Sequence, residues 1–222
     1  MENSYQDTEL FWDQVFAEEE VYNAHEEFPF KKIEDSIEWL CRNDGFILDF
    51  GCGDGRVLNR CFDYGAEKVL GIDISKNAVQ TANKAAKKNN LNERSYFVIG
   101  GIDELKNISS DTADGIILFN IVDNLKPEDG IKVLEECSRI LKNNGRIILK
   151  LNPYYDTKKL KEDNNYQKIG DSLYREKSSL YLWNLSREKI ENLLKKYFVI
   201  ENYQEVEFKE FNMINRLYYL SK

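Results

Sequence analysis

Acidic residues and glycines crowd into the stretch ILDFGCGDGRVL, residues 47–58. Asp49 falls within a short apolar run, and Gly51, Gly53 and Gly55 follow it at alternate positions. Glycine adopts positive φ and lets a ligand approach the backbone, while the start of a following helix offers unpaired N–H groups. A strand, a glycine turn and a helix make a nucleotide-binding arrangement, and two very different ligands use it.

The spacing of these glycines argues against a dinucleotide. A dinucleotide fold requires G-x-G-x-x-G, and Arg56 stands where the third glycine would lie. The chain instead reads G-x-G-x-G, and Asp73 ends the next apolar run about 20 residues later. Arg56 thus argues against a nicotinamide-dependent oxidoreductase, which we keep as a rival interpretation. A titration with reduced nicotinamide dinucleotide would decide between the two.

This combination resembles motif I and the following acidic loop of the class I S-adenosylmethionine-dependent methyltransferases, and the resemblance covers nearly the whole chain. It implies S-adenosylmethionine as the cofactor and methyl transfer as the reaction. It also implies that Asp73 accepts both ribose hydroxyls, and that Asp49 lies beneath the amino-acid end of the cofactor. The backbone of Gly51, Cys52 and Gly53 would line that same end.

The resemblance implies further cofactor contacts after the next three strands. Family members commonly carry an acid just after the third strand, where this chain has Gly101 in VIGGIDEL. Ile102, which follows, can still pack on the adenine ring, and Asp103 can accept a hydrogen bond from the adenine amino group. The contacts expected on this basis are Ile74, Ile102, Asp103, Asn120 and Ile121.

No catalytic residue is established by the sequence. A sulfonium methyl is already activated, so alignment and dehydration can supply most of the acceleration without a protein nucleophile. Several relatives place a histidine where Asp123 lies, and this chain has none there; its single histidine is His25. The weak candidates are His25, Asp123 and Tyr155, the last within an N-P-Y-Y stretch that resembles an amino-methyltransferase motif but follows the wrong strand.

Aromatic residues cluster in the two segments expected to build the acceptor pocket, the N-terminal cap and an insertion over 152–185. An aromatic wall suits an apolar acceptor or a cationic amine, although most single rings of this kind are core residues. We predict a small-molecule acceptor. The rings concerned are Tyr5, Phe11, Trp12, Tyr22, Tyr154, Tyr155, Tyr174, Tyr181 and Trp183.

Composition limits the partners, metals and cellular locations that this protein can have. The 222 residues carry a formal charge of −8, which disfavours a nucleic-acid partner. Four cysteines without a C-x-x-C pair and one histidine support no metal site. The N-terminus lacks a signal-peptide pattern, and no apolar run approaches the roughly 18 residues of a membrane span. We therefore expect a cytoplasmic protein without membrane contact.

Apolar runs alternate with helical patterns along the chain. Strands are predicted at 47–50, 68–74, 95–100, 113–119 and 146–151, and helices at 7–20, 30–43, 75–88, 127–141 and 186–196. Two longer strands, 198–208 and 213–221, suggest an antiparallel hairpin. The pattern predicts an α/β, Rossmann-like fold: a seven-stranded, mostly parallel sheet with helices on both faces and a C-terminal antiparallel hairpin.

One domain over 1–222 is expected, with 1–43 as a helical cap and 152–185 as a substrate-side insertion. Two alternatives to small-molecule methylation stay open. One is a protein or RNA methyltransferase, for which the locally basic stretch LKNNGRIILKLNPYYDTKKLK would be the groove. The other is a protein that binds S-adenosylmethionine without turnover.

Overall fold

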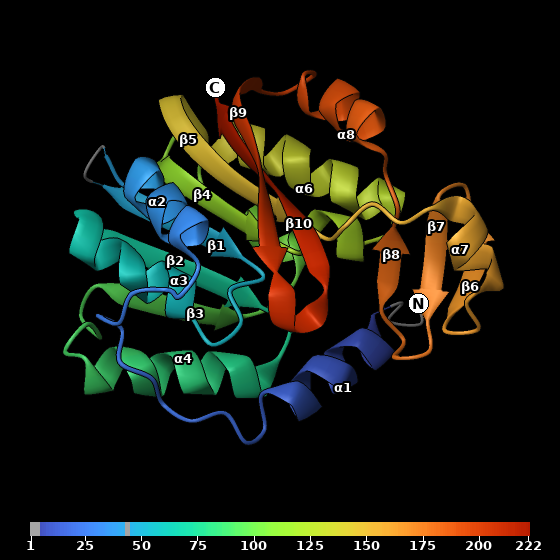
Figure 1. Cartoon of the computed structure of the whole chain (residues 1–222). Helices are drawn as coiled ribbons and strands as arrows, with labels where there is room; N and C mark the ends of the chain where they lie inside the picture. Colours follow the sequence, from blue (N-terminus) through green and yellow to red (C-terminus); the bar gives the residue numbers. More distant parts are fainter. Residues whose placement is uncertain (1–4, 43–44) are drawn as a thin grey trace.

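A seven-stranded sheet forms the centre of the computed structural model, which describes residues 5–42 and 45–222 (Figure 1). Its strand order is β3-β2-β1-β4-β5-β10-β9, with β10 antiparallel to both of its neighbours and the first five strands parallel. The predicted fold is confirmed. The strands are β1 (Phe46–Phe50), β2 (Lys68–Asp73), β3 (Ser95–Ile99), β4 (Ala113–Phe119), β5 (Leu141–Leu151), β9 (Val199–Phe208) and β10 (Met213–Ser221).

Helices cover both faces of the sheet, so the parallel strands are apolar on both sides. One apolar cluster joins the sheet to α2, α3 and the turn after α3, while α4 packs against β3 and β2. The other cluster joins the sheet to α5, α6 and α8. These helices are α2 (Lys31–Leu40), α3 (Arg56–Arg60), α4 (Lys76–Lys88), α5 (Ile102–Leu105), α6 (Pro127–Ile140) and α8 (Arg187–Leu194).

The strand order reverses between β2 and β4, on either side of β1. In open α/β sheets a ligand binds in the crevice outside the carboxyl ends of the strands at such a reversal. The glycine turn follows β1 and Asp73 ends β2, so the fold brings both features to that crevice.

Two segments differ from the sequence-based expectation. Helix α1 (Gln6–Val15) ends earlier than predicted, before three consecutive glutamates at 18–20 that a helix C-terminus disfavours. The insertion, in which no helix or strand was predicted, forms α7 (Thr157–Glu162) and a separate antiparallel sheet beside the main one (Figure 1). Its strands, β6 (Tyr166–Gly170), β7 (Leu173–Glu176) and β8 (Tyr181–Trp183), are too short for a clear alternation pattern.

Short 3-10 turns connect several of these elements: η1 (Cys61–Tyr64), η2 (Val122–Asn124) and η3 (Lys209–Phe211). Turn η1 helps to hold a buried ion pair between α2 and α3. Arg60 Nε donates to Glu34 Oε1 at 2.6 Å, and the two residues are only 6% and 7% exposed. Glu34 also accepts from Tyr64 Oη at 2.6 Å and from Phe28 N at 3.0 Å, so its carboxylate is well satisfied.

Removing one partner of this pair should destabilise the fold. Arg60→Met leaves the Glu34 carboxylate buried without its counter-charge, which costs about 3–5 kcal/mol of unfolding free energy. Burial alone would raise the pKa of Glu34, but the bonds from Arg60, Tyr64 and Phe28 hold it below its usual value. The stabilisation is therefore present above the ordinary carboxyl pKa and lost as pH falls.

Urea denaturation of the single and double variants would measure this effect. The matched Arg60→Met, Glu34→Met protein removes both charges together and should lose far less stability than Arg60→Met alone. Equal losses in the single and double variants would mean that the pair itself contributes nothing.

Candidate cofactor site

The turn between β1 and α3 is held against β2 by its backbone. Gly51 N and Cys52 N both donate to Ile72 O, at 2.8 and 3.1 Å. Gly51 and Gly53 have φ values of 80° and 53°. A Cβ added at Gly53 would lie 3.0 Å from Phe16 Cζ, and one at Gly51 would lie 3.0 Å from an Ile121 methyl. Both positions therefore favour glycine for backbone conformation and for space.

Asp73 joins this turn to the next helix. Its Oδ2 accepts from Gly53 N at 2.8 Å and its Oδ1 accepts from Ser75 N at 2.9 Å. Burial raises the pKa of the carboxyl, against these two bonds, which lower it. Each carboxylate oxygen has a second lone pair, so Asp73 can still accept hydrogen bonds from a ligand in the crevice.

A cavity of about 640 Å³ lies over the turn and Asp73, at the carboxyl ends of β1 to β4. It contains most of the predicted cofactor contacts: Gly51, Gly53, Asp73, Ile74, Ile102, Asp103, Asn120 and Ile121. Sequence reasoning did not assign several other lining residues, because their place depends on how helices and strand ends pack. Among these are Glu9, Phe16, Ile99, Phe119, Asn124, Asp129 and Lys132.

Helix α1 closes one side of the cavity. Tyr5, Glu9, Trp12 and Phe16 recur at helical spacing and all line it. The helix is fixed at both ends: Tyr5 Oη donates to Asp129 Oδ2 at 2.8 Å, and Asp13 Oδ1 accepts from Ser75 Oγ at 2.6 Å. Phe16 then lies over Gly53, as its close approach to that glycine shows.

Asparagines form a polar layer where β4 and β5 end. Asn120 Nδ2 donates to Asn152 Oδ1 at 2.6 Å, and Asn152 Nδ2 donates to Asn124 Oδ1 at 2.9 Å. Asn120 has a φ of 53°, a left-handed conformation that asparagine tolerates better than most residues. Asp123 is buried behind this layer, where its Oδ2 accepts from Asn152 N at 2.7 Å.

Two predicted cofactor residues, Asp49 and Cys52, lie outside the cavity lining. The Cys52 side chain is buried against β2, close to Gly71, so only its backbone belongs to the turn. Asp49 is 2% exposed, and its Oδ1 has no hydrogen-bond partner among the described residues. Burial raises the pKa of this carboxyl well above its usual value, and the nearby Asp73 and Asp54 add to the shift.

These features fit S-adenosylmethionine. The unpaired Asp49 oxygen beneath the turn would be an acceptor for the ammonium end of the cofactor, directly or through a water. The glycine positions leave room for the methionine part, and Asp73 lies where a ribose would meet it. The assignment of individual contacts stays a prediction.

The three candidate catalytic residues also lie outside the cavity lining. His25 is exposed, and its Nδ1 pairs with Asp63 Oδ1 at 2.8 Å on the far side of α3, so the structure gives a base role no support. Tyr155 packs against Tyr166 of the insertion with ring centroids 6.1 Å apart. Asp123 is the nearest of the three, because its neighbours Asn120 and Asn124 line the cavity. Burial raises its pKa to about 6.

Most of the predicted aromatic wall is structural. Tyr5 and Trp12 line the cavity, whereas Tyr174 and Trp183 are buried within the insertion. Tyr181 already has the guanidinium of Arg175 4.2 Å and the amine of Lys126 5.6 Å from its ring centroid. The insertion therefore gives no support to a cage for a cationic amine.

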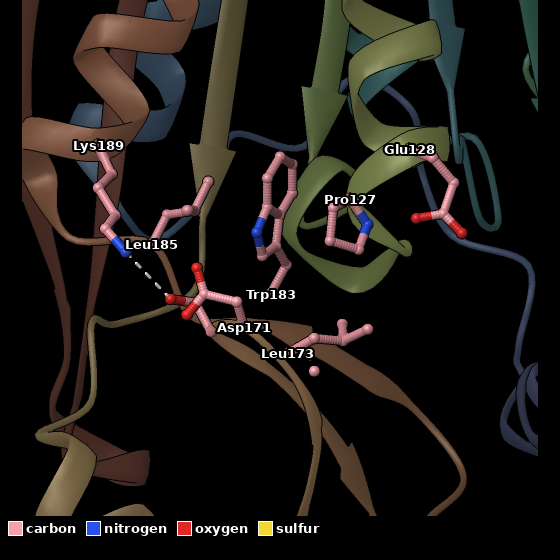
Figure 2. Close-up of a pocket in the computed structure, with 9 residues that line it drawn as sticks. Pro127, Glu128, Asp171, Leu173, Trp183, Leu185 and Lys189 are labelled. Atoms are coloured by element: carbon pink, nitrogen blue, oxygen red, sulfur yellow. Dashed lines mark hydrogen bonds between the residues drawn. The ribbon is translucent and has the colours of Figure 1, made fainter.

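A second pocket, of about 450 Å³, lies on the other side of the insertion (Figure 2). It is bounded by Trp183, Leu173 and Leu185 and by the side chain of Lys189, whose Nζ donates to Ser172 Oγ at 3.3 Å. None of its lining residues is shared with the first cavity. Its position away from the glycine turn excludes it from the cofactor site.

Two absences hold for the described residues. Within residues 5–42 and 45–222, no group of three histidine, cysteine or acidic side chains is arranged to hold a metal ion. No helix in that same part of the chain is long and apolar enough to cross a membrane.

Comparison with known proteins identifies this architecture. Residues 48–149 match the family described as methyltransferase domain. The chain is 32% identical over 94 residues to the ribosomal protein L11 methyltransferase of Photobacterium profundum, a match that covers 41% of this chain and 32% of that protein. The chain thus spans about a third of the length of the curated relatives it matches most strongly.

Solved structures extend the likeness over most of the chain. A 1,6-didemethyltoxoflavin-N1-methyltransferase from Burkholderia thailandensis, with bound S-adenosylhomocysteine, gives a TM-score of 0.69 at 17% identity and covers 87% of this chain and 79% of its own. A geranyl diphosphate C-methyltransferase from Streptomyces coelicolor gives 0.71 at 12% identity and covers 99% and 97%. At these identities the likeness is one of fold.

The family match over residues 48–149 and the fold both agree with the predicted methyltransferase class, and the fold is that of methyltransferases solved with S-adenosylhomocysteine.

Proposed function

We propose that this protein transfers a methyl group from S-adenosylmethionine to a small-molecule acceptor. The observation that carries the proposal is the cover over the cavity. Helix α1 is bonded at Tyr5 to α6 and at Asp13 to α4, so it covers one side of the cavity and narrows the room for a macromolecule. A cavity of about 640 Å³ has room for the cofactor and little more than a small acceptor.

The chain's own residues act by positioning. The turn over Gly51 to Gly53 and the carboxylate of Asp73 fix one partner, while the asparagine layer fixes the ends of β4 and β5 beside it. When bound, S-adenosylmethionine supplies a methyl carbon whose bond to sulfur breaks as an acceptor lone pair bonds to it, leaving a neutral thioether. Alignment of this kind is worth roughly 7–11 kcal/mol, so no protein nucleophile is required.

A protein acceptor is the second candidate, because a relative matched over its methyltransferase region is named for ribosomal protein L11. An RNA acceptor is less favoured. The lysines that line the cavity, Lys106 and Lys132, are paired with Asp103 and Asp129, and the whole chain carries a charge of −8.

Formation of S-adenosylhomocysteine should be measured with libraries of small molecules, peptides and RNA. We expect turnover with small molecules alone. Turnover confined to peptides or RNA would contradict the proposed acceptor, and cofactor binding without turnover on any acceptor would point to a protein that binds without catalysis.

Replacing Asp73 should weaken cofactor binding. Asp73→Ala removes the acceptor of two ribose hydroxyls, and at roughly 1.5–3 kcal/mol per bond to a charged group the affinity for S-adenosylhomocysteine should fall at least tenfold. Because Gly53 N and Ser75 N lose their partner as well, the variant should also be less stable. Calorimetric titration gives the first quantity and thermal unfolding the second.

The control for Asp73 separates ribose contact from support of the turn. Asp73→Asn keeps an oxygen acceptor and should lose less stability than the alanine variant. A 2′,3′-dideoxyribose analogue of the ligand should bind wild type and Asp73→Ala almost equally well. Equal weakening of the analogue would mean that Asp73 acts only through the turn.

Replacing Asp49 should stabilise the unliganded protein and weaken cofactor binding, whereas replacing Asp73 should reduce both stability and binding. Asp49→Asn replaces a buried carboxyl, whose ionised form burial penalises, with a neutral amide, so the unliganded protein should become more stable. Its affinity for S-adenosylhomocysteine should fall, because the negative group beneath the amino-acid end is gone. Thermal unfolding with and without ligand measures both effects. An unchanged ligand-induced shift in Tm would remove Asp49 from the site.

Helix α1 should act as a lid. We expect amide hydrogen exchange over residues 5–25 to slow on addition of S-adenosylhomocysteine, because the ligand adds contacts beneath Trp12 and Phe16. Asp13→Ala removes two bonds to the start of α4, from Ser75 Oγ and Asn77 N, and should speed ligand release. The same protection with and without ligand would contradict a lid.

A further inference from the structure

Lys150 is a partly buried lysine without a counter-ion. It belongs to β5 and pairs in register with Phe119 of β4. Its Nζ lies 5.0 Å from the ring centroid of Phe119 and 5.5 Å from that of Phe208. Over the described residues 5–42 and 45–222, no hydrogen-bond acceptor and no carboxylate pairs with this Nζ. Burial lowers its pKa to about 8, against the attraction of Asp123, which raises it.

A second unsatisfied polar group lies on the same face of the sheet. Lys150 stands opposite Leu217 of β10, and Asn215 is two residues before Leu217, so both side chains fall on the α2 face. Asn215 is 4% exposed, and its Oδ1 has no partner in the part of the chain that the structure describes. Buried polar groups are rarely left in this state unless a ligand or water completes them.

Phe119 connects this pair of residues to the cofactor cavity. It lines the cavity and also contacts the ammonium of Lys150. Phe208 lies across from it and packs on Phe30, with ring centroids 4.4 Å apart. The ammonium of Lys150 and two phenyl rings thus meet where β4 and β5 end, and the strand register places Asn215 on the same face of the sheet. Phe119 is the member of this group that lines the cavity.

We infer that Lys150 and Asn215 hold the methyl acceptor, and that this acceptor is a small aromatic compound with an anionic oxygen group. The inference rests on the proposed function. The anionic oxygen pairs with Lys150 Nζ, a hydroxyl or N–H of the same compound donates to Asn215 Oδ1, and the rings of Phe119 and Phe208 flank its plane.

The charges around the site favour this class of acceptor over a cationic one. The two cavity lysines, Lys106 and Lys132, already pair with aspartates, whereas Lys150 does not. Asp123 is the acid whose charge raises the pKa of Lys150, and its Oδ2 already accepts a hydrogen bond from Asn152 N. An incoming anion therefore finds one ammonium that lacks a partner.

Calorimetry on the complex with S-adenosylhomocysteine tests the inference, with 3-hydroxybenzoate as the probe. Lys150→Met should weaken the probe by roughly tenfold or more, and Lys150→Arg should restore most of the binding. Lys142→Met is the matched control, because Lys142 is on the same strand but pairs with Asp114 away from the cavity. It should leave the probe affinity unchanged. Neutral 3-hydroxybenzamide and cationic benzylammonium should bind more weakly than the acid.

Stability supplies a second readout. Lys150→Met removes an ammonium that burial penalises, and Asn215→Leu removes an unsatisfied oxygen, so each should raise the Tm of the unliganded protein, by roughly 2–4 °C per variant. A lower Tm in both variants would show that these residues serve the fold, and would overturn the inference.

The outcomes separate the two proposals. Wild type that fails to bind S-adenosylhomocysteine contradicts the proposed function. If S-adenosylhomocysteine binds wild type and Lys150→Met with equal affinity, the cofactor site is intact. The affinity for 3-hydroxybenzoate then tests the acceptor site alone. Equal probe affinity in both proteins, preference for benzylammonium, or no binding of the aromatic acid would each overturn the inference.

Discussion

The carboxylate of Asp73 is the interaction on which the site depends. It accepts one backbone N–H from the glycine turn, at Gly53, and one from the start of α4, at Ser75, so two separate segments share a single anchor. A carboxylate has two charged oxygens, so it can accept from both donors and still accept from a ligand in the crevice. A backbone carbonyl or a hydroxyl has one uncharged oxygen and could not do this. The turn and the helix start are thereby fixed together.

The cover over the cavity depends on the same region. Asp13 of α1 accepts from Ser75 Oγ and from Asn77 N, so it adds a negative charge where the N-terminus of α4 is partially positive. The hydrogen bond from Ser75, together with that from Asn77, lowers the pKa of Asp13. Helix α1 is therefore attached to the same helix start that Asp73 contacts through Ser75 N.

Unsatisfied polar groups mark the two ends of the proposed reaction path. Asp49 lies beneath the glycine turn with one oxygen unpaired, and Asn215 lies on the α2 face in the same condition, near the ammonium of Lys150. Each costs stability in the unliganded protein. In the proposed function these costs are offset when the cofactor and the acceptor supply the missing partners.

The fold class, and the place of the glycine turn and Asp73 at one edge of the sheet, could be predicted from the sequence, because they rest on local patterns. Apolar runs alternating with helical periods predict a parallel sheet, and glycines with flanking aspartates mark its ligand-binding edge. The short strands of the insertion could not be predicted, since three to five residues carry too little periodicity.

Only the tertiary structure decided which side chains meet. His25 was a candidate base by residue type, yet packing places it beside Asp63, away from the cavity. Lys150 and Asn215 carry no motif and are 65 positions apart in sequence. They share one face only because β10 inserts beside β5 in a register that sets Leu217 opposite Lys150. Residue type and spacing determined the glycine turn at the edge of the sheet, whereas strand pairing, a long-range property, decided which side chains share a face with Lys150.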